Sequence, residues 1–79
     1  MLVALSIGGN TMTAYRVEGC LGVTVGSVST IDEATALVLK QIPISNKTMS
    51  QLAGRLSRKA VGQWVHVDYG GTGCTVFVE

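Results

Sequence analysis

The sequence predicts an α+β domain in which a small antiparallel sheet packs against two central helices. Both ends of the 79-residue chain alternate apolar and polar residues, as strands do, whereas the middle repeats apolar residues at helical spacing. The chain is 47% hydrophobic, which is enough apolar material for one core. The expected order is therefore β-β-(β)-α-α-β-β, within a single domain that spans residues 1–79.

The N-terminal part is expected to form a hairpin and a third, shorter strand. Residues 2–7 alternate, and the β-branched residues of 11–17 favour an antiparallel return. Between them, Gly8–Asn10 supplies residues that adopt the positive φ of a tight turn. The third strand is expected over 23–28 because this segment is rich in valine, although Gly26 interrupts it.

The first helix is predicted between Thr30 and Ile42. Thr30 and Glu33 have the spacing of a capping box, and apolar residues then recur at helical spacing. Pro43 ends this helix, because the residue before a proline avoids the α conformation.

The second helix is expected to begin at Ser45 or Asn46 and to end at Gly62. Its apolar stripe consists of Met49, Leu52, Ala53, Leu56 and Ala60. Gly54 lies inside it, where glycine costs about 1 kcal/mol relative to alanine. Close packing against a neighbouring element is the explanation that we expect for this glycine.

Residues 63–69 and 74–79 are expected to form a C-terminal hairpin around the loop Gly70–Gly73. In that register Tyr69 faces Cys74, and the valines of both strands share one face of the sheet. The other face carries Trp64, His66, Asp68, Thr75, Phe77 and Glu79. The glycine-rich run YGGTGCT leads from strand to strand without a lysine, so we interpret it as a turn and not as a phosphate-binding loop.

The sequence contains no recognisable catalytic or metal-binding motif. His66 is the only histidine, and the expected register places it on the opposite face from Cys74. Asp68 shares the face of His66 and can contact it, but no serine motif accompanies the pair. Short cysteine and histidine spacings typical of zinc sites are also lacking. We therefore predict a non-catalytic protein without a metal or another cofactor.

The two cysteines are too few for a disulfide framework, and reduced thiols are expected. Cys20 lies between glycines in an expected turn, where exposure allows an intermolecular disulfide. A homodimer is one expected partner, because small domains often gain stability from association. No segment reaches the roughly 18 apolar residues of a membrane span, and the N-terminus lacks the basic segment of a secretory signal. A cytoplasmic protein without a membrane partner is expected.

Charge is unevenly distributed along the chain, although the net charge is only +1. No acidic residue occurs from Ala34 through Val67, a stretch that contains Lys40, Lys47, Arg55, Arg58 and Lys59. On a helical wheel Lys47, Arg55 and Arg58 fall opposite Leu56, with Lys59 at the border. This basic face is either the ordinary solvated side of an amphipathic helix or a docking surface for phosphates or an acidic protein. The predicted partner-binding residues are Lys47, Gln51, Arg55, Arg58, Lys59, Trp64 and His66.

Residues 30–79 are expected to form a helix, a break, a second helix and a hairpin, with the sequences TIDEATALVLKQI, PIS, TMSQLAGRLSRKAVG and QWVHVDYGGTGCTVFVE. This order resembles the second half of a winged-helix domain, and S-x-x-T-M-S-x-L-x-x-x-L is similar to its recognition helices. The resemblance implies that the helix from Asn46 enters the major groove, with Lys47, Thr48, Gln51 and Arg55 near DNA. The family begins with a helix, whereas residues 1–28 are expected to form strands.

In size and in its lack of catalytic motifs the chain is similar to the small stand-alone inhibitors made by phages and mobile elements, including anti-CRISPR proteins. This similarity concerns the general class of protein and does not depend on any residue motif. It implies an inhibitor that docks on a host nucleic-acid-handling complex, such as a CRISPR effector, and blocks binding of DNA or of a subunit. A pI near 7.8 favours a protein or nucleoprotein partner over free DNA. The alternative is a winged-helix-like, DNA-binding regulatory protein.

Overall fold

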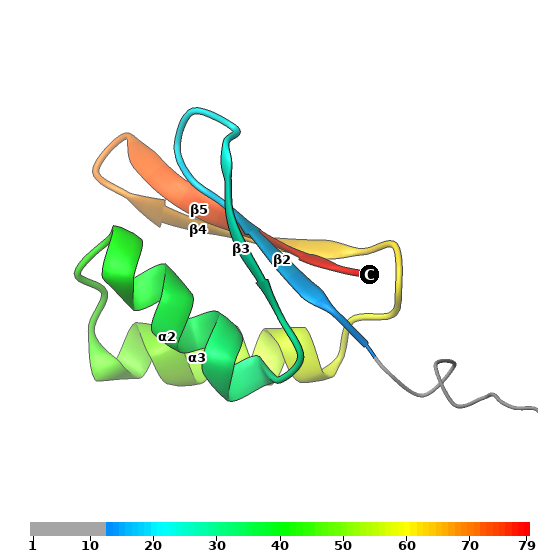
Figure 1. The fold of residues 1–79 in the computed structure, drawn as a ribbon. Coiled ribbons are helices and arrows are strands. Elements are labelled where there is room, and N and C mark those ends of the chain that lie inside the picture. Colours follow the sequence, from blue (N-terminus) through cyan, green and yellow to red (C-terminus); the bar gives the residue numbers. More distant parts are fainter. Residues whose placement is uncertain (1–12) are drawn as a thin grey trace, which may run out of the picture.

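The computed structural model describes residues 13–79, in which two helices lie on one side of an antiparallel sheet (Figure 1). The elements are β2 (Tyr15–Glu18), β3 (Thr24–Val28), α2 (Ile31–Gln41), α3 (Asn46–Ser57), β4 (Trp64–Tyr69) and β5 (Thr72–Val78). The four strands lie in the order β3-β2-β5-β4. The predicted α+β class and the order of the described elements are confirmed. The strand expected at residues 2–7 and the turn at Gly8–Asn10 lie outside the described residues.

The two hairpins form one sheet because β2 pairs with β5 at its centre. Val17 lies opposite Val76, and Arg16 lies opposite Phe77. Within the described residues, the strand predicted over 11–17 spans Tyr15–Glu18. Since directly opposed residues share a face, the pairing separates a valine face from a face that carries charged and aromatic side chains.

The C-terminal hairpin has a tighter turn than the sequence predicts. Gly70 and Gly71 alone connect β4 to β5, and both have positive φ, 56° and 86°, as a type I′ turn requires. Val67 therefore lies opposite Cys74 and Tyr69 opposite Thr72, so the predicted four-residue loop and its register are wrong by two residues. A shift of two residues keeps every side chain on its face, and the predicted valine face is confirmed.

The core lies between the valine face of the sheet and the two helices. Its largest fully buried side chains are Leu52, Leu56, Val17, Val38, Val65, Val76 and Cys74. α2 packs mainly against β2 and β3, whereas α3 packs against β4. The helix layer thus places α3 along the edge of the sheet that β4 forms (Figure 1).

Side-chain caps fix the start of each helix. The Thr30 hydroxyl accepts a hydrogen bond from the Glu33 amide at 3.1 Å, which confirms the predicted cap of α2. The Glu33 carboxylate in turn accepts from the Ser29 amide at 3.3 Å. At α3 the cap is Ser45, whose hydroxyl accepts from the Thr48 amide at 3.1 Å. These bonds satisfy amides that a helix leaves without backbone partners.

α3 ends at Ser57, before the predicted stop at Gly62. The reason is a set of competing hydrogen bonds in the turn that follows. The Ala60 amide donates to the Gln63 side chain at 2.8 Å, and the Gln63 amide donates to the Ala60 carbonyl at 3.0 Å. Ala60 is consequently exposed and does not belong to the apolar stripe, so that part of the prediction is wrong.

Close packing does not explain Gly54. A Cβ atom at this position meets only the Arg58 side chain, at 3.8 Å, which is an ordinary contact. Gly26 on β3 is instead the glycine that lies against a helix, because a Cβ atom there approaches the Leu37 side chain of α2 to 2.7 Å. The absence of a side chain at Gly26 therefore lets α2 pack on the sheet.

Candidate functional site

Three exposed polar side chains form a ridge along α3. Lys47, Gln51 and Arg55 are spaced four residues apart, so they lie above one another on the helix surface. Arg55 is one residue away from the buried Leu56, a rotation of about 100°. It is therefore not directly opposite the core, as the helical wheel suggested, and it lies on the flank of α3 that borders β4.

The ridge forms one wall of a groove whose other wall is β4. In the half nearer the start of α3, a hollow of about 260 Å³ is lined by Thr48, Gln51, Leu52, Arg55, His66, Val67 and Asp68. In the half nearer its end, a hollow of about 360 Å³ is lined by Arg55, Lys59, Gly62, Gln63 and Trp64. Arg55 lines both hollows. We call this surface the α3–β4 groove.

The groove brings together five of the predicted partner-binding residues, namely Gln51, Arg55, Lys59, Trp64 and His66. Lys47 lies on the same ridge, one turn before Gln51. Arg58 caps the C-terminal end of α3 and lines neither hollow. Thr48 was expected near DNA through the winged-helix resemblance alone, and sequence reasoning missed Gln63. Their place in the groove depends on how α3 packs beside β4.

The positive charges of α3 have no acidic partners in the described part of the chain. Within residues 13–79 the ion pairs join Arg16 to Glu18 and to Glu79, and Asp68 contacts the imidazole of His66. The two remaining acids, Asp32 and Glu33, lie in the first turn of α2. Residues 1–12 contain no Asp or Glu. The groove therefore carries positive charge that this chain's own acids do not neutralise, apart from Asp68 at one end.

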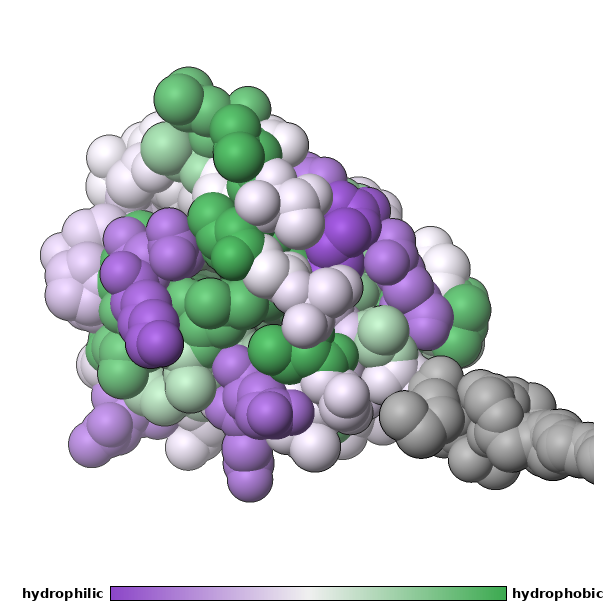
Figure 2. Space-filling view, in the orientation of Figure 1, coloured by the Kyte–Doolittle hydropathy of each residue, from purple (hydrophilic) through white to green (hydrophobic). Residues whose placement is uncertain are grey.

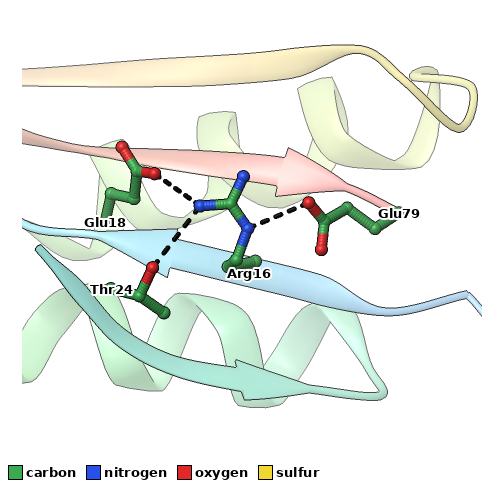
Figure 3. A network of polar contacts seen from close by, with 4 residues as sticks. All are labelled: Arg16, Glu18, Thr24 and Glu79. Atoms are coloured by element: carbon green, nitrogen blue, oxygen red, sulfur yellow. Dashed lines mark hydrogen bonds and ion pairs between the residues drawn. The ribbon is translucent and has the colours of Figure 1, made fainter. Parts of the chain in front are cut away.

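Arg16 is used within the sheet and not in the groove (Figure 3). Its Nε donates to Glu79 at 2.9 Å, its Nη1 contacts Glu18, and the guanidinium group lies 4.3 Å from the centre of the Phe77 ring. The hydrogen bonds that Arg16 donates to Glu79 and Glu18 raise its pKa, and the guanidinium group is charged in any case. This network covers the centre of the sheet face that points away from the helices.

His66 and Asp68 are in contact, as their shared face allowed. Nε2 of His66 lies 3.0 Å from a carboxylate oxygen of Asp68, and Nδ1 lies 2.9 Å from the Thr75 hydroxyl. The Asp68 side chain is 89% exposed, so water screens this pair strongly. Among the described residues no three His, Cys, Asp or Glu side chains are placed to hold a metal ion. The contacts hold the imidazole ring against β5, on the sheet face that points away from the helices.

The two cysteines differ in environment. Cys20 lies in the turn between β2 and β3 and is exposed, next to an 86% exposed Leu21. Hydrophobic residues accordingly cover the tip of this hairpin in Figure 2. Cys74 is buried under the helices, and burial raises the pKa of its thiol. A raised pKa lowers the fraction of reactive thiolate at a given pH.

We expect one thiol of the native protein to react quickly with a disulfide reagent and the other only on unfolding. Because thiolate is the reacting form, Cys20 should account for the fast reaction, and Cys20→Ser should abolish it. Any covalent dimer on a non-reducing gel should disappear in the same variant. Equal reaction rates at both cysteines in the native protein would contradict the burial of Cys74.

Comparison of the chain with protein-family models, with curated proteins and with solved structures finds no match. Neither helix of residues 13–79 has the length and apolar character needed to cross a bilayer. The α3–β4 groove is therefore the feature of the molecule from which a function can be inferred.

Proposed function

We propose that this chain is a non-catalytic binding protein whose α3–β4 groove docks on an acidic protein surface. The observation that supports this function is the row of unneutralised positive side chains beside an exposed tryptophan. Arg55 lies at the centre of the groove, and Trp64 is 56% exposed at one end of it. Arginine and tryptophan are among the residue types that contribute most to binding energy in protein interfaces.

The biological role that we propose is that of a phage or mobile-element inhibitor acting in the cytoplasm. Its target is a host nucleic-acid-handling complex, such as a CRISPR effector, on which it blocks binding of a subunit or of DNA. The small size of the chain and its localised positive charge support this role. A net charge of +1 leaves little general attraction to nucleic acid, so the groove must select its target by local complementarity.

Charge reversal in the groove tests this proposal. Wild-type protein is immobilised, partners are captured from a bacterial lysate, and the affinity of the captured partner is measured for single variants. Arg55→Glu is expected to weaken binding at least about 30-fold, because a central positive group is replaced by a repelling one.

Two matched variants control for net charge. Arg58→Glu makes the same charge change at the end of α3, outside both hollows, and should weaken binding less. Lys40→Glu makes it in the last turn of α2 and should leave the affinity unchanged within about twofold. Unaltered binding by Arg55→Glu would show that the groove is not the docking surface.

A second candidate function is duplex DNA binding of the winged-helix type. It is favoured by one observation: the exposed ridge contains Lys47, Gln51 and Arg55, which the resemblance places near DNA. A gel-shift titration over a salt series distinguishes this function. DNA binding should weaken steeply with salt, with a slope of about −0.9 per phosphate contacted. No shift at low salt would remove this candidate.

A further inference from the structure

β4 is an edge strand, and its free edge faces the same side as the groove. Sheet order places β4 at one end, with β5 as its neighbour among the described strands. The opposite edge is β3, in a segment that carries no charged residue from Gly19 to Ile31. Among the strands that the structure describes, the β4 edge is therefore the one that combines outward backbone groups with a positive wall.

The register identifies which backbone groups of β4 point away from β5. At one end of the ladder the Val78 amide donates a hydrogen bond to the Gln63 carbonyl at 2.9 Å. At the other end, the two-residue turn is closed by a hydrogen-bonded pair, Tyr69 and Thr72. Bonded and non-bonded pairs alternate along an antiparallel ladder, so Val65 and Val67 are bonded to β5. The amide and carbonyl groups directed outward are those of Trp64, His66 and Asp68.

The ridge on α3 has nearly the spacing of a β-strand. Residues four apart on a helix are separated by about 6 Å along the axis. Residues two apart on a strand point to the same side and are separated by about 6.6 Å. A strand added beside β4 would therefore bring alternate side chains close to Gln51 and Arg55 in turn, and then to Lys59, which follows the end of α3. Its other side chains would lie beside Trp64 and His66.

We propose that the partner segment is an extended acidic stretch, with carboxylates at every second position, that adds to β4 as a fifth strand. Backbone hydrogen bonds to Trp64, His66 and Asp68 would supply affinity, and the ridge would select the acidic side chains. Asp68 disfavours acids on the opposite side of the same segment. This inference rests on the proposed function, because it states the shape and charge pattern of the acidic partner.

The probe is a blocked heptapeptide in which Glu and Thr alternate, titrated into ¹⁵N-labelled full-length protein. Amide hydrogen exchange at Trp64, His66 and Asp68 is expected to slow at least about tenfold at saturation. The amides of Val65 and Val67 serve as internal controls, because they already bond to β5. Two control peptides keep the composition: one has its glutamates contiguous, and the other is N-methylated on the side that faces β4. Each should bind at least about tenfold more weakly.

The outcomes separate the two proposals. If Arg55→Glu abolishes partner binding but the N-methylated peptide binds as well as its parent, the groove is correct and strand addition is wrong. Strand addition is also wrong if no peptide binds at concentrations up to about 1 mM while partner binding remains sensitive to Arg55→Glu. A Kd of 1 mM corresponds to a binding free energy of about −4 kcal/mol. If neither the peptide nor the partner responds to Arg55→Glu, both proposals are overturned. Equal binding of alternating and contiguous peptides overturns the spacing argument.

Discussion

Replacing Leu56 with alanine is expected to destabilise the fold by about 2–5 kcal/mol, because the change leaves a cavity in the centre of the core. The Leu56 side chain is 1% exposed and lies on the inner side of α3. A domain of 79 residues has a total stability of only about 4–12 kcal/mol. One such substitution therefore removes a large part of the free energy of unfolding.

Urea unfolding followed by circular dichroism measures this loss. Leu39→Ala is the matched control, because Leu39 lies on α2 and is 42% exposed. The control is expected to cost less than about 1 kcal/mol. Equal losses for the two leucines would contradict the packing of α3 against the sheet.

The fold could be predicted from local patterns because each pattern has one dominant physical cause. The side chain of Thr30 accepts a hydrogen bond from the Glu33 amide, one of the first amides of the helix, and this cap forms as predicted. The alternation of valines in β4 and β5 also predicts which face is buried. Such signals act within a few residues, so the sequence alone contains them.

The exact turn and the end of α3 could not be predicted in the same way. Glycines at 70, 71 and 73 are compatible with several loop lengths, and the observed one follows from the φ values of Gly70 and Gly71. Helical periodicity continues to Ala60, but hydrogen bonds with Gln63 favour a turn there. The turn length and the end of α3 both depend on interactions outside the local pattern, which a periodic pattern does not contain.

Only part of the candidate site could be predicted, because its remaining part depends on tertiary packing. The positive ridge follows from helical spacing and needs no knowledge of the fold. The groove requires α3 to lie beside β4, so its second wall could not be derived from the helix alone. The network around Arg16 depends on contact with Glu79, which is 63 positions away and meets Arg16 only because β2 pairs with β5.

Gly73→Ala is expected to destabilise the C-terminal hairpin by about 1–3 kcal/mol, because the added methyl group has no space. Gly73 is buried in β5 opposite Asp68. A Cβ atom there overlaps the backbone carbonyl of Val67 and lies 3.2 Å from Nε2 of His66. Backbone cannot rotate away as a flexible side chain can, so β4 and β5 must separate locally.

The same substitution at Gly54 is the matched control, with the opposite expected sign. An added methyl group at Gly54 meets only the Arg58 side chain, and alanine is favoured over glycine within a helix. Gly54→Ala is therefore expected to stabilise the protein by about 0.5–1 kcal/mol. Thermal unfolding of both variants should shift the midpoint in opposite directions. A neutral Gly73→Ala would mean that the two strands are further apart at this pair than the register places them.

Because Gly73 lies beside the ring of His66, its variant should also displace that ring and weaken partner binding, whereas Gly54→Ala should not.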